Sequence, residues 1–274
     1  MALPERLEIV THGRRLCVDV GGAPTGVPCV LLHPFPFDRR YFAPTARQIE
    51  GRARTIVPDL RGFGDSELGG DFAIAELADD VAAILDHLRI ERAVIVGLSM
   101  GGYVALAFAA KYPRRMLGLV LSDTRAGADS AQARANRDLD MDFVRSNGTP
   151  AFVERQLPRL LSATAPETLR ADVKRLGAQK SEAVLAALQA LRDRPDRHAE
   201  LANITCPSLV LVGTDDVLTP PADAAAMATA IPRAVLMELP GAAHLANLEA
   251  PAPFAQAIIG FLGRAQSAVS TPKT

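Results

Sequence analysis

The sequence contains no tryptophan, only three cysteines and almost no net charge. Its 30 basic residues nearly balance its 31 acidic residues, so electrostatics give no reason to expect a nucleic acid or an anionic membrane as a partner. The cysteines Cys17, Cys29 and Cys206 are odd in number and far apart, which fits reduced thiols of a cytoplasmic protein better than a disulfide framework. No cysteine or histidine pair has the spacing of metal ligands, and we expect neither a metal nor a cofactor.

Long apolar runs are also missing. No stretch approaches the roughly 20 consecutive apolar residues of a transmembrane helix, and residues 1–6 lack the basic-then-apolar layout of a signal peptide. Hydrophobic residues nevertheless make up 49% of the 274 positions, which is enough for a large buried core. The length is compatible with one α/β domain that carries an insertion.

Short apolar runs alternate with segments of helical periodicity. Apolar runs too short for a helix suit strands that are buried on both faces, and their alternation with helices predicts a mostly parallel sheet covered on both sides. Strands are predicted over 7–10, 15–20, 28–33, 54–57, 93–96, 117–121, 208–212 and 234–239, and helices over 74–88, 103–110, 222–230 and 253–262.

This alternation breaks over residues 125–201, which are rich in Ala, Arg and Leu and are interrupted by four prolines. We interpret this segment as a helical cap over the carboxyl edge of the sheet, where open α/β sheets bind their ligands. The predicted organisation is a core of residues 1–124 and 202–265, the cap of residues 125–201 between its two parts, and a polar, disordered tail over 266–274.

A candidate nucleophile lies in the segment Gly97-Leu98-Ser99-Met100-Gly101. The segment matches G-x-S-x-G and falls between a predicted buried strand and a predicted helix, which is the context this motif requires. A strained turn would lift the Ser99 hydroxyl clear of the backbone, while the glycines let strand and helix approach each other. The helix amino terminus then places the Met100 N–H where it can bind an oxyanion.

A general base and an acid are expected at the same edge. Of five histidines, His244 lies in a loop after the last predicted strand, at the edge where Ser99 lies, and it is the predicted base. Asp215 and Asp216 follow the preceding strand, and the chain order Ser, Asp, His fits such a site. Spacing alone does not choose between these two aspartates, and Asp123 is a third option.

Six further segments make the sequence similar to the α/β-hydrolase family over nearly the whole chain: LLHPFPFD (31–38), PDLRGFGDSE (58–67), GLSMGGYVALAFA (97–109), LVLSDTRAGAD (119–129), VGTDDVLTPP (212–221) and PGAAHLANLEAP (240–251). The resemblance implies a mostly parallel eight-stranded sheet flanked by helices, with a helical cap inserted before the last two strands. The family's G-x-x-D-x-x-x-P pattern selects Asp216 as the acid. Its second oxyanion donor matches the Phe35 N–H, although Pro34 stands where the family usually has glycine.

Other residues in these segments have structural roles in the family. The resemblance implies that His33 shapes the loop that contains Phe35, and we expect Asp59, Arg61 and Gly62 to form the turn after the fourth strand. Glu249 is expected to anchor the loop of the predicted base.

The resemblance favours a serine hydrolase that cleaves carboxylic esters of small to medium acyl chain through an acyl-enzyme, with a small-molecule ester or lactone as its substrate. It leaves the oligomeric state open. We expect an apolar pocket wall formed by Phe35, Met100, Leu218 and Leu245, with Phe143 from the cap. Haloalkane dehalogenases and epoxide hydrolases attack with a carboxylate where this chain has Ser99, which argues against both.

Alternative functions remain open at this point. The motifs are also similar to those of 3-oxoadipate enol-lactonases, whose substrate carries a carboxylate, and Arg125 is then the candidate partner for that carboxylate. Cofactor-free perhydrolysis is a further alternative, which the absence of tryptophan disfavours because related haloperoxidases commonly place one near the oxyanion loop. A small-molecule receptor on the hydrolase fold is an alternative of another class.

Overall fold

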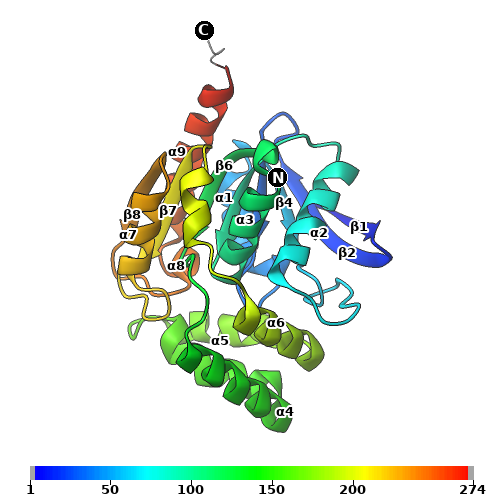
Figure 1. Ribbon diagram of the computed structural model, residues 1–274, viewed down its shortest axis with the longest axis vertical. Helices are drawn as coiled ribbons and strands as arrows, with labels where there is room; N and C mark the ends of the chain where they lie inside the picture. Colours follow the sequence, from blue (N-terminus) through cyan, green and yellow to red (C-terminus); the bar gives the residue numbers. More distant parts are fainter. Residues whose placement is uncertain (1–3, 271–274) are drawn as a thin grey trace.

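The structure is a computed structural model that describes residues 4–270, with side chains described up to residue 266. An eight-stranded sheet forms its centre, in the order β1-β2-β4-β3-β5-β6-β7-β8 (Figure 1). Strand β2 pairs antiparallel with both β1 and β4, and all the other neighbouring strands pair parallel. The predicted mostly parallel eight-stranded sheet is therefore confirmed. The strands are β1 (Glu5–Thr11), β2 (Arg14–Gly22), β3 (Val27–Leu32), β4 (Ala53–Pro58), β5 (Ala93–Leu98), β6 (Met116–Ser122), β7 (Ser208–Gly213) and β8 (Ala234–Leu239).

Burial explains why these segments form strands in these places. Every residue of the central strands β5 and β7 is buried, which is why both read as continuous apolar runs in the sequence. The edge strand β8 instead alternates between partly buried and exposed positions over most of its length, as expected where one face meets solvent.

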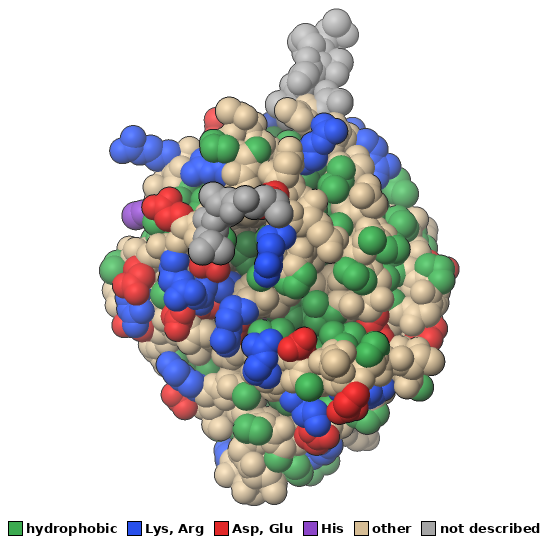
Figure 2. Space-filling view, turned by 180° about the vertical axis from the view of Figure 1, so that it is seen from behind, with side chains coloured by type: hydrophobic (Ala, Val, Ile, Leu, Met, Phe, Trp, Pro, Cys, Tyr) green, Lys and Arg blue, Asp and Glu red, His purple; other side chains and the backbone are tan. Residues whose placement is uncertain are grey.

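Helices cover both faces of the sheet, and each face has its own hydrophobic cluster. The helices α2 (Ile74–His87), α3 (Met100–Lys111) and α7 (Pro221–Ala230) contribute to one cluster. The other cluster contains residues of α1 (Ala43–Ile49), α8 (Ala246–Glu249) and α9 (Pro251–Ser270). Basic and acidic side chains stand side by side on the face that is turned away in Figure 1, as Figure 2 shows.

Three helices lie in the connection from β6 to β7, on one side of the sheet (Figure 1). They are α4 (Ala131–Leu160), α5 (Glu167–Gly177) and α6 (Ser181–Asp193), and residues 131–193 are called the helical insertion below. The helix α4 consists of two segments joined at Gly148, whose backbone (φ 78°, ψ 168°) is not helical. Because of this kink, α4 is two shorter helices that meet at an angle.

Several elements differ from the sequence prediction. The helix α1 and the 3-10 turn Arg39–Phe42 before it were not predicted, and α3 begins at Met100, three residues before the predicted start. The helix α9 continues to Ser270, so the boundary of a disordered tail at Gln266 is wrong. The remaining tail residues, 271–274, lie outside the described part of the chain.

Candidate active site

Ser99 occupies a sharp turn between β5 and α3. Its backbone has φ 53° and ψ −113°, a conformation that costs a residue with a side chain about 1–3 kcal/mol. The Ser99 N–H donates to the Ser122 carbonyl oxygen at 2.9 Å, and the Thr124 hydroxyl donates to the Ser99 carbonyl oxygen at 2.8 Å. The surrounding structure therefore holds Ser99 in this strained conformation.

The two motif glycines are required by close backbone contacts. A Cβ atom at Gly97 would lie 2.1 Å from the carbonyl oxygen of Gly101, and one at Gly101 would lie 2.0 Å from that of Leu32. Any side chain at either position would push α3 away from the sheet. The tight turn that exposes the Ser99 hydroxyl thus depends on both glycines.

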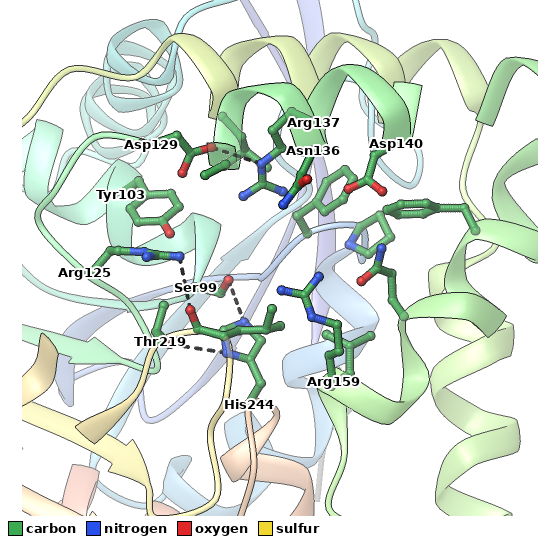
Figure 3. A pocket seen from close by; sticks show the side chains of 18 residues that line it. Ser99, Tyr103, Arg125, Asp129, Asn136, Arg137, Asp140, Arg159, Thr219 and His244 are labelled. Carbon is green, nitrogen blue, oxygen red and sulfur yellow. Dashed lines mark hydrogen bonds and ion pairs between the residues drawn. The ribbon is translucent and has the colours of Figure 1, made fainter. Parts of the chain in front are cut away.

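Ser99, His244 and Asp216 form a continuous hydrogen-bonded chain (Figure 3). The Ser99 Oγ lies 2.9 Å from His244 Nε2, and His244 Nδ1 lies 2.9 Å from Asp216 Oδ2. The side chains of His244 and Asp216 are buried, whereas Ser99 is partly exposed. The Ser99 hydroxyl is thus the accessible end of a hydrogen-bonded chain whose other two side chains are buried.

Asp216 is held in place by donors from its own loop. Its Oδ1 accepts the N–H groups of Leu218 at 2.8 Å and Thr219 at 3.1 Å, and its Oδ2 accepts the Thr219 hydroxyl at 2.6 Å. Burial raises the pKa of this carboxyl, but the hydrogen bond and charge of His244 and the bonds from Thr219 outweigh burial, so the pKa is lowered. The carboxyl therefore stays ionised and can orient the imidazole.

The other two aspartates considered from the sequence lie elsewhere. Asp215 is exposed, and its carboxylate accepts the Thr214 hydroxyl at 3.0 Å. Asp123 is buried and accepts the Ser122 hydroxyl and the Gly213 N–H at 2.6 and 2.8 Å. The geometry therefore pairs His244 with Asp216 among the three.

Glu249 ties the loop of His244 to the helical insertion. Its two carboxylate oxygens accept the Ala243 N–H at 2.8 Å and the Ser162 N–H at 2.9 Å. The Leu245 N–H also donates to the Leu160 carbonyl oxygen at the end of α4, at 3.1 Å. Hydrogen bonds from the residues before and after His244 consequently hold its loop in place.

The loop after β3 brings Phe35 to the same place. His33 is fully buried, its Nε2 accepts the Leu60 N–H at 3.0 Å, and its Nδ1 lies 3.0 Å from the Pro34 carbonyl oxygen. Burial lowers the pKa of His33 to about 4, so the ring is neutral with its proton on Nδ1. This neutral imidazole fixes the path of the chain into Phe35, a structural role that the sequence also suggests.

A cavity that is partly open to solvent adjoins Ser99 and His244. Core residues form one side of it and the helical insertion forms the other (Figure 3). Three of the predicted substrate-binding residues line it: Phe35 and Leu218 from the expected wall, and Arg125, the candidate partner for a substrate carboxylate. The lining residues are Phe35, Pro36, Ser99, Tyr103, Arg125, Asp129, Ala133, Asn136, Arg137, Asp140, Phe152, Gln156, Arg159, Leu160, Leu191, Leu218, Thr219 and His244.

The prediction of an apolar wall is wrong in two respects. Met100, Leu245 and Phe143 do not line the cavity: the first two side chains are fully buried in the hydrophobic clusters, and the Phe143 ring lies 3.8 Å from the Arg155 guanidinium carbon. Charged and amide side chains of α4 line it instead. Residues 133, 136, 137 and 140 lie on one helix face, and 152, 156, 159 and 160 lie on one face of the second segment, a helical spacing that was a usable signal in the sequence.

Residues 4–270 contain neither a cluster of metal-ligating side chains nor a membrane-spanning helix. No group of three or more His, Cys, Asp or Glu side chains in that part of the chain is arranged to hold a metal ion. Within residues 4–270, none of the helices has the length and apolar character needed to cross a membrane.

Comparisons with known proteins agree with this fold. A family model described as the alpha/beta hydrolase fold matches residues 27–251. The chain is similar to a thermophilic esterase from Thermogutta terrifontis, solved with malate bound, at 37% identity and a TM-score of 0.90 over 95% of this chain and 99% of that one. It is also similar to the enol-lactonase from Burkholderia xenovorans LB400, at 28% identity and a TM-score of 0.88 over 94% and 100% of the two chains.

The sequence is also similar to that of an enol-lactonase over most of its length. The chain is 27% identical to 3-oxoadipate enol-lactonase 1 of Acinetobacter baylyi, over 92% of this chain and 94% of the relative. The similarity thus extends across both the sheet and the helical insertion.

Proposed function

This chain belongs to the α/β-hydrolase fold family, and from that premise we propose that it hydrolyses carboxylic esters of small to medium acyl chain through an acyl-enzyme on Ser99. The observation that carries the proposal is the hydrogen-bonded chain from Asp216 through His244 to the Ser99 hydroxyl, which ends at the cavity. This is the arrangement that turns a weakly nucleophilic hydroxyl into a nucleophile for acyl transfer.

The first half of the reaction acylates Ser99. His244 Nε2 takes the hydroxyl proton as Ser99 Oγ attacks the ester carbonyl, and the oxyanion of the tetrahedral intermediate is bound by the N–H groups of Met100 and Phe35. Met100 is the first residue of α3, so its N–H has no acceptor within the helix. His244 then gives the proton to the leaving alcohol.

The second half releases the acid. Water enters, His244 Nε2 removes one of its protons, and the resulting hydroxide attacks the acyl carbonyl to form a second oxyanion. When this intermediate collapses, the bond from the acyl carbon to Ser99 Oγ breaks, Ser99 takes the proton back from His244, and the acid leaves. Asp216 remains ionised throughout, keeps the proton of the neutral imidazole on Nδ1 and stabilises the imidazolium. Apart from the substrate and water, every group that takes part in these steps belongs to the chain itself.

A lactone is the second candidate substrate, and the enol-lactonases among the similar proteins support it. Its chemistry differs from that of an ester in one respect only: the alcohol that leaves stays attached to the acyl group. The acyl-enzyme mechanism is the same for both.

The test compares variants on p-nitrophenyl esters from acetate to dodecanoate. We expect turnover by the wild type and a loss in kcat of roughly 10⁴–10⁶-fold in Ser99→Ala, because the nucleophile is gone. We expect Asp216→Asn to lower kcat by roughly 10⁴-fold through the wrong imidazole tautomer, whereas the adjacent Asp215→Asn is a matched control with little effect.

Two results would overturn this proposal. Turnover by purified Ser99→Ala at the wild-type rate would show that another group attacks the ester. Greater damage from Asp215→Asn than from Asp216→Asn would show that the wrong acid was assigned.

A further inference from the structure

The cavity beside Ser99 carries an excess of positive charge. Three arginines and two aspartates line it. Both aspartates are already paired with arginines: Asp129 lies 3.2 Å from Arg137 Nε and 2.7 Å from Nη1 of Arg194, which lies outside the cavity wall.

The second aspartate is neutralised in the same way. Asp140 Oδ1 lies 2.5 Å from Nη2 of Arg155, which also lies outside the wall. Each aspartate is thus in direct contact with an arginine, and the charges of Arg137 and Arg159 also act on the Asp140 carboxyl from a greater distance.

Arg159 is an exposed cation of the cavity whose guanidinium is not in direct contact with an acidic side chain, although the charge of Asp140 acts on it from a greater distance. Within the part of the chain that the structure describes, its guanidinium makes no hydrogen bond and no ion pair. The side chain leaves the second segment of α4 and points into the cavity beside His244 and Ser99 (Figure 3). A guanidinium offers five N–H donors in a planar fork that matches a carboxylate.

Arg125, the cation suggested from the sequence, is more constrained. Its Nη2 donates to the Leu218 carbonyl oxygen at 3.1 Å, and its Nη1 lies 3.9 Å from Asp223 Oδ2. Arg125 is thus fixed to the loop after β7, whereas Arg159 keeps its donors for a ligand.

Arg137 shares the cavity with Arg159 and points into it from the other segment of α4 (Figure 3). Asp129 already offsets the charge of Arg137, but three arginines and two aspartates leave the cavity with a net positive charge, and an anion that binds Arg159 gains charge-assisted hydrogen bonds. A neutral acyl chain would leave Arg159 without such bonds. The cavity is therefore built for an anionic group close to the reacting hydroxyl.

We propose that Arg159, supported by Arg137, binds a free carboxylate on the substrate, so that the preferred substrates are esters that carry a carboxylate besides the scissile bond. This inference rests on the proposed ester hydrolysis at Ser99. It makes Arg159 a residue that determines specificity.

The experiment compares two pairs of substrates that differ only in a terminal carboxylate. Monomethyl adipate and methyl hexanoate place it on the acyl side, and 5-acetoxypentanoate and pentyl acetate place it on the alcohol side. The measured quantity is the ratio of kcat/KM for the anionic and neutral members. We expect a ratio above one in at least one pair, and a fall of about 10–100-fold in that ratio in Arg159→Gln.

Arg145→Gln is the matched control. Arg145 also lies on α4, but it is exposed, pairs with Asp142 at 2.8 Å and does not line the cavity. We expect this variant to keep the wild-type ratio, because it removes the same charge from the same helix at a distance from the substrate. Arg159→Lys should retain part of the preference, since it keeps the charge but loses the fork.

A binding measurement makes the outcome independent of turnover. In Ser99→Ala the esters stay intact, and calorimetry should show tighter binding of the anionic member, with the difference lost in Ser99→Ala/Arg159→Gln. Equal binding of both members would overturn the inference. A kcat/KM ratio of one or less in both pairs, or an equal fall of that ratio in Arg145→Gln, would also overturn it. In each of these cases, Ser99-dependent hydrolysis of the neutral esters would leave the proposed function intact.

Discussion

At the scale of single residues, His33 shows how a buried polar group shapes the site without taking part in chemistry. Both ring nitrogens are used, one by the Leu60 N–H and one by the Pro34 carbonyl oxygen. Protonation of Nε2 would remove the acceptor for Leu60 and place a charge in a site without solvent. This is the physical reason why the pKa of His33 is lowered to about 4.

This lowered pKa predicts a loss of stability in acid. An unfolded histidine has a pKa near 6.5, so between about pH 6.5 and pH 4 the unfolded chain binds a proton at His33 that the folded chain does not. The contribution to stability is complete above pH 6.5 and is lost as the pH falls, by roughly 3 kcal/mol in total. Denaturant unfolding at pH 7 and pH 4.5 should show a smaller difference for His33→Gln than for the wild type.

Nuclear magnetic resonance of the imidazole gives an independent check if His33→Gln does not fold. The His33 ring should keep the Nδ1-protonated tautomer and should not titrate between pH 8 and pH 5. A titration midpoint near pH 6.5 would contradict the prediction.

At the scale of elements, the kink in α4 decides which side chains reach the cavity. Gly148 has φ 78°, a conformation that glycine adopts freely and other residues adopt at a cost. It joins the segment that carries Arg137 to the segment that carries Arg159. A straight helix would not bring both segments to the same cavity.

Gly148→Ala should therefore destabilise the protein by about 1–3 kcal/mol. Gly260→Ala is the matched control, because Gly260 lies within α9, has an ordinary φ and has open space where a Cβ would be. The control should stabilise the protein by up to about 1 kcal/mol through helix propensity. Denaturant unfolding of both variants measures the difference, and equal stabilities would mean that the kink carries no strain for alanine.

The elements differ in how well the sequence predicts them. The central strands could be predicted because continuous apolar runs such as β5 and β7 are buried on both faces. The helix α1 has only seven residues with two buried side chains, too few for a periodic pattern. The arginines of α4 were missed because periodicity shows which residues share a helix face, but not which face turns to the cavity, and that depends on the angle at Gly148.

At the scale of the whole molecule, the site is assembled by the sheet. Ser99 follows β5, Asp216 follows β7, His244 follows β8 and Phe35 follows β3. Parallel strands end at one edge, so the topology alone predicts that these four residues meet. The charged lining comes from packing of the helical insertion against that edge, which no local pattern in the sequence describes.

The helical insertion shares its core with the sheet. Buried residues of α4 and α6, among them Phe152 and Leu188, belong to the same hydrophobic cluster as residues of α2, α3 and the strands. A cluster that is continuous across both parts predicts that they unfold together.

Leu188→Ala tests this coupling from within the helical insertion. Leu188 is fully buried in α6, so its truncation should cost about 2–5 kcal/mol. The matched control is Leu139→Ala, because Leu139 lies in α4 but is exposed, and its effect should stay within about 0.5 kcal/mol. Calorimetry of Leu188→Ala should show one transition at a lower temperature, with equal calorimetric and van 't Hoff enthalpies. A separate early transition, with the sheet still folded, would instead show that the helical insertion unfolds on its own and that the cavity can open without loss of the core.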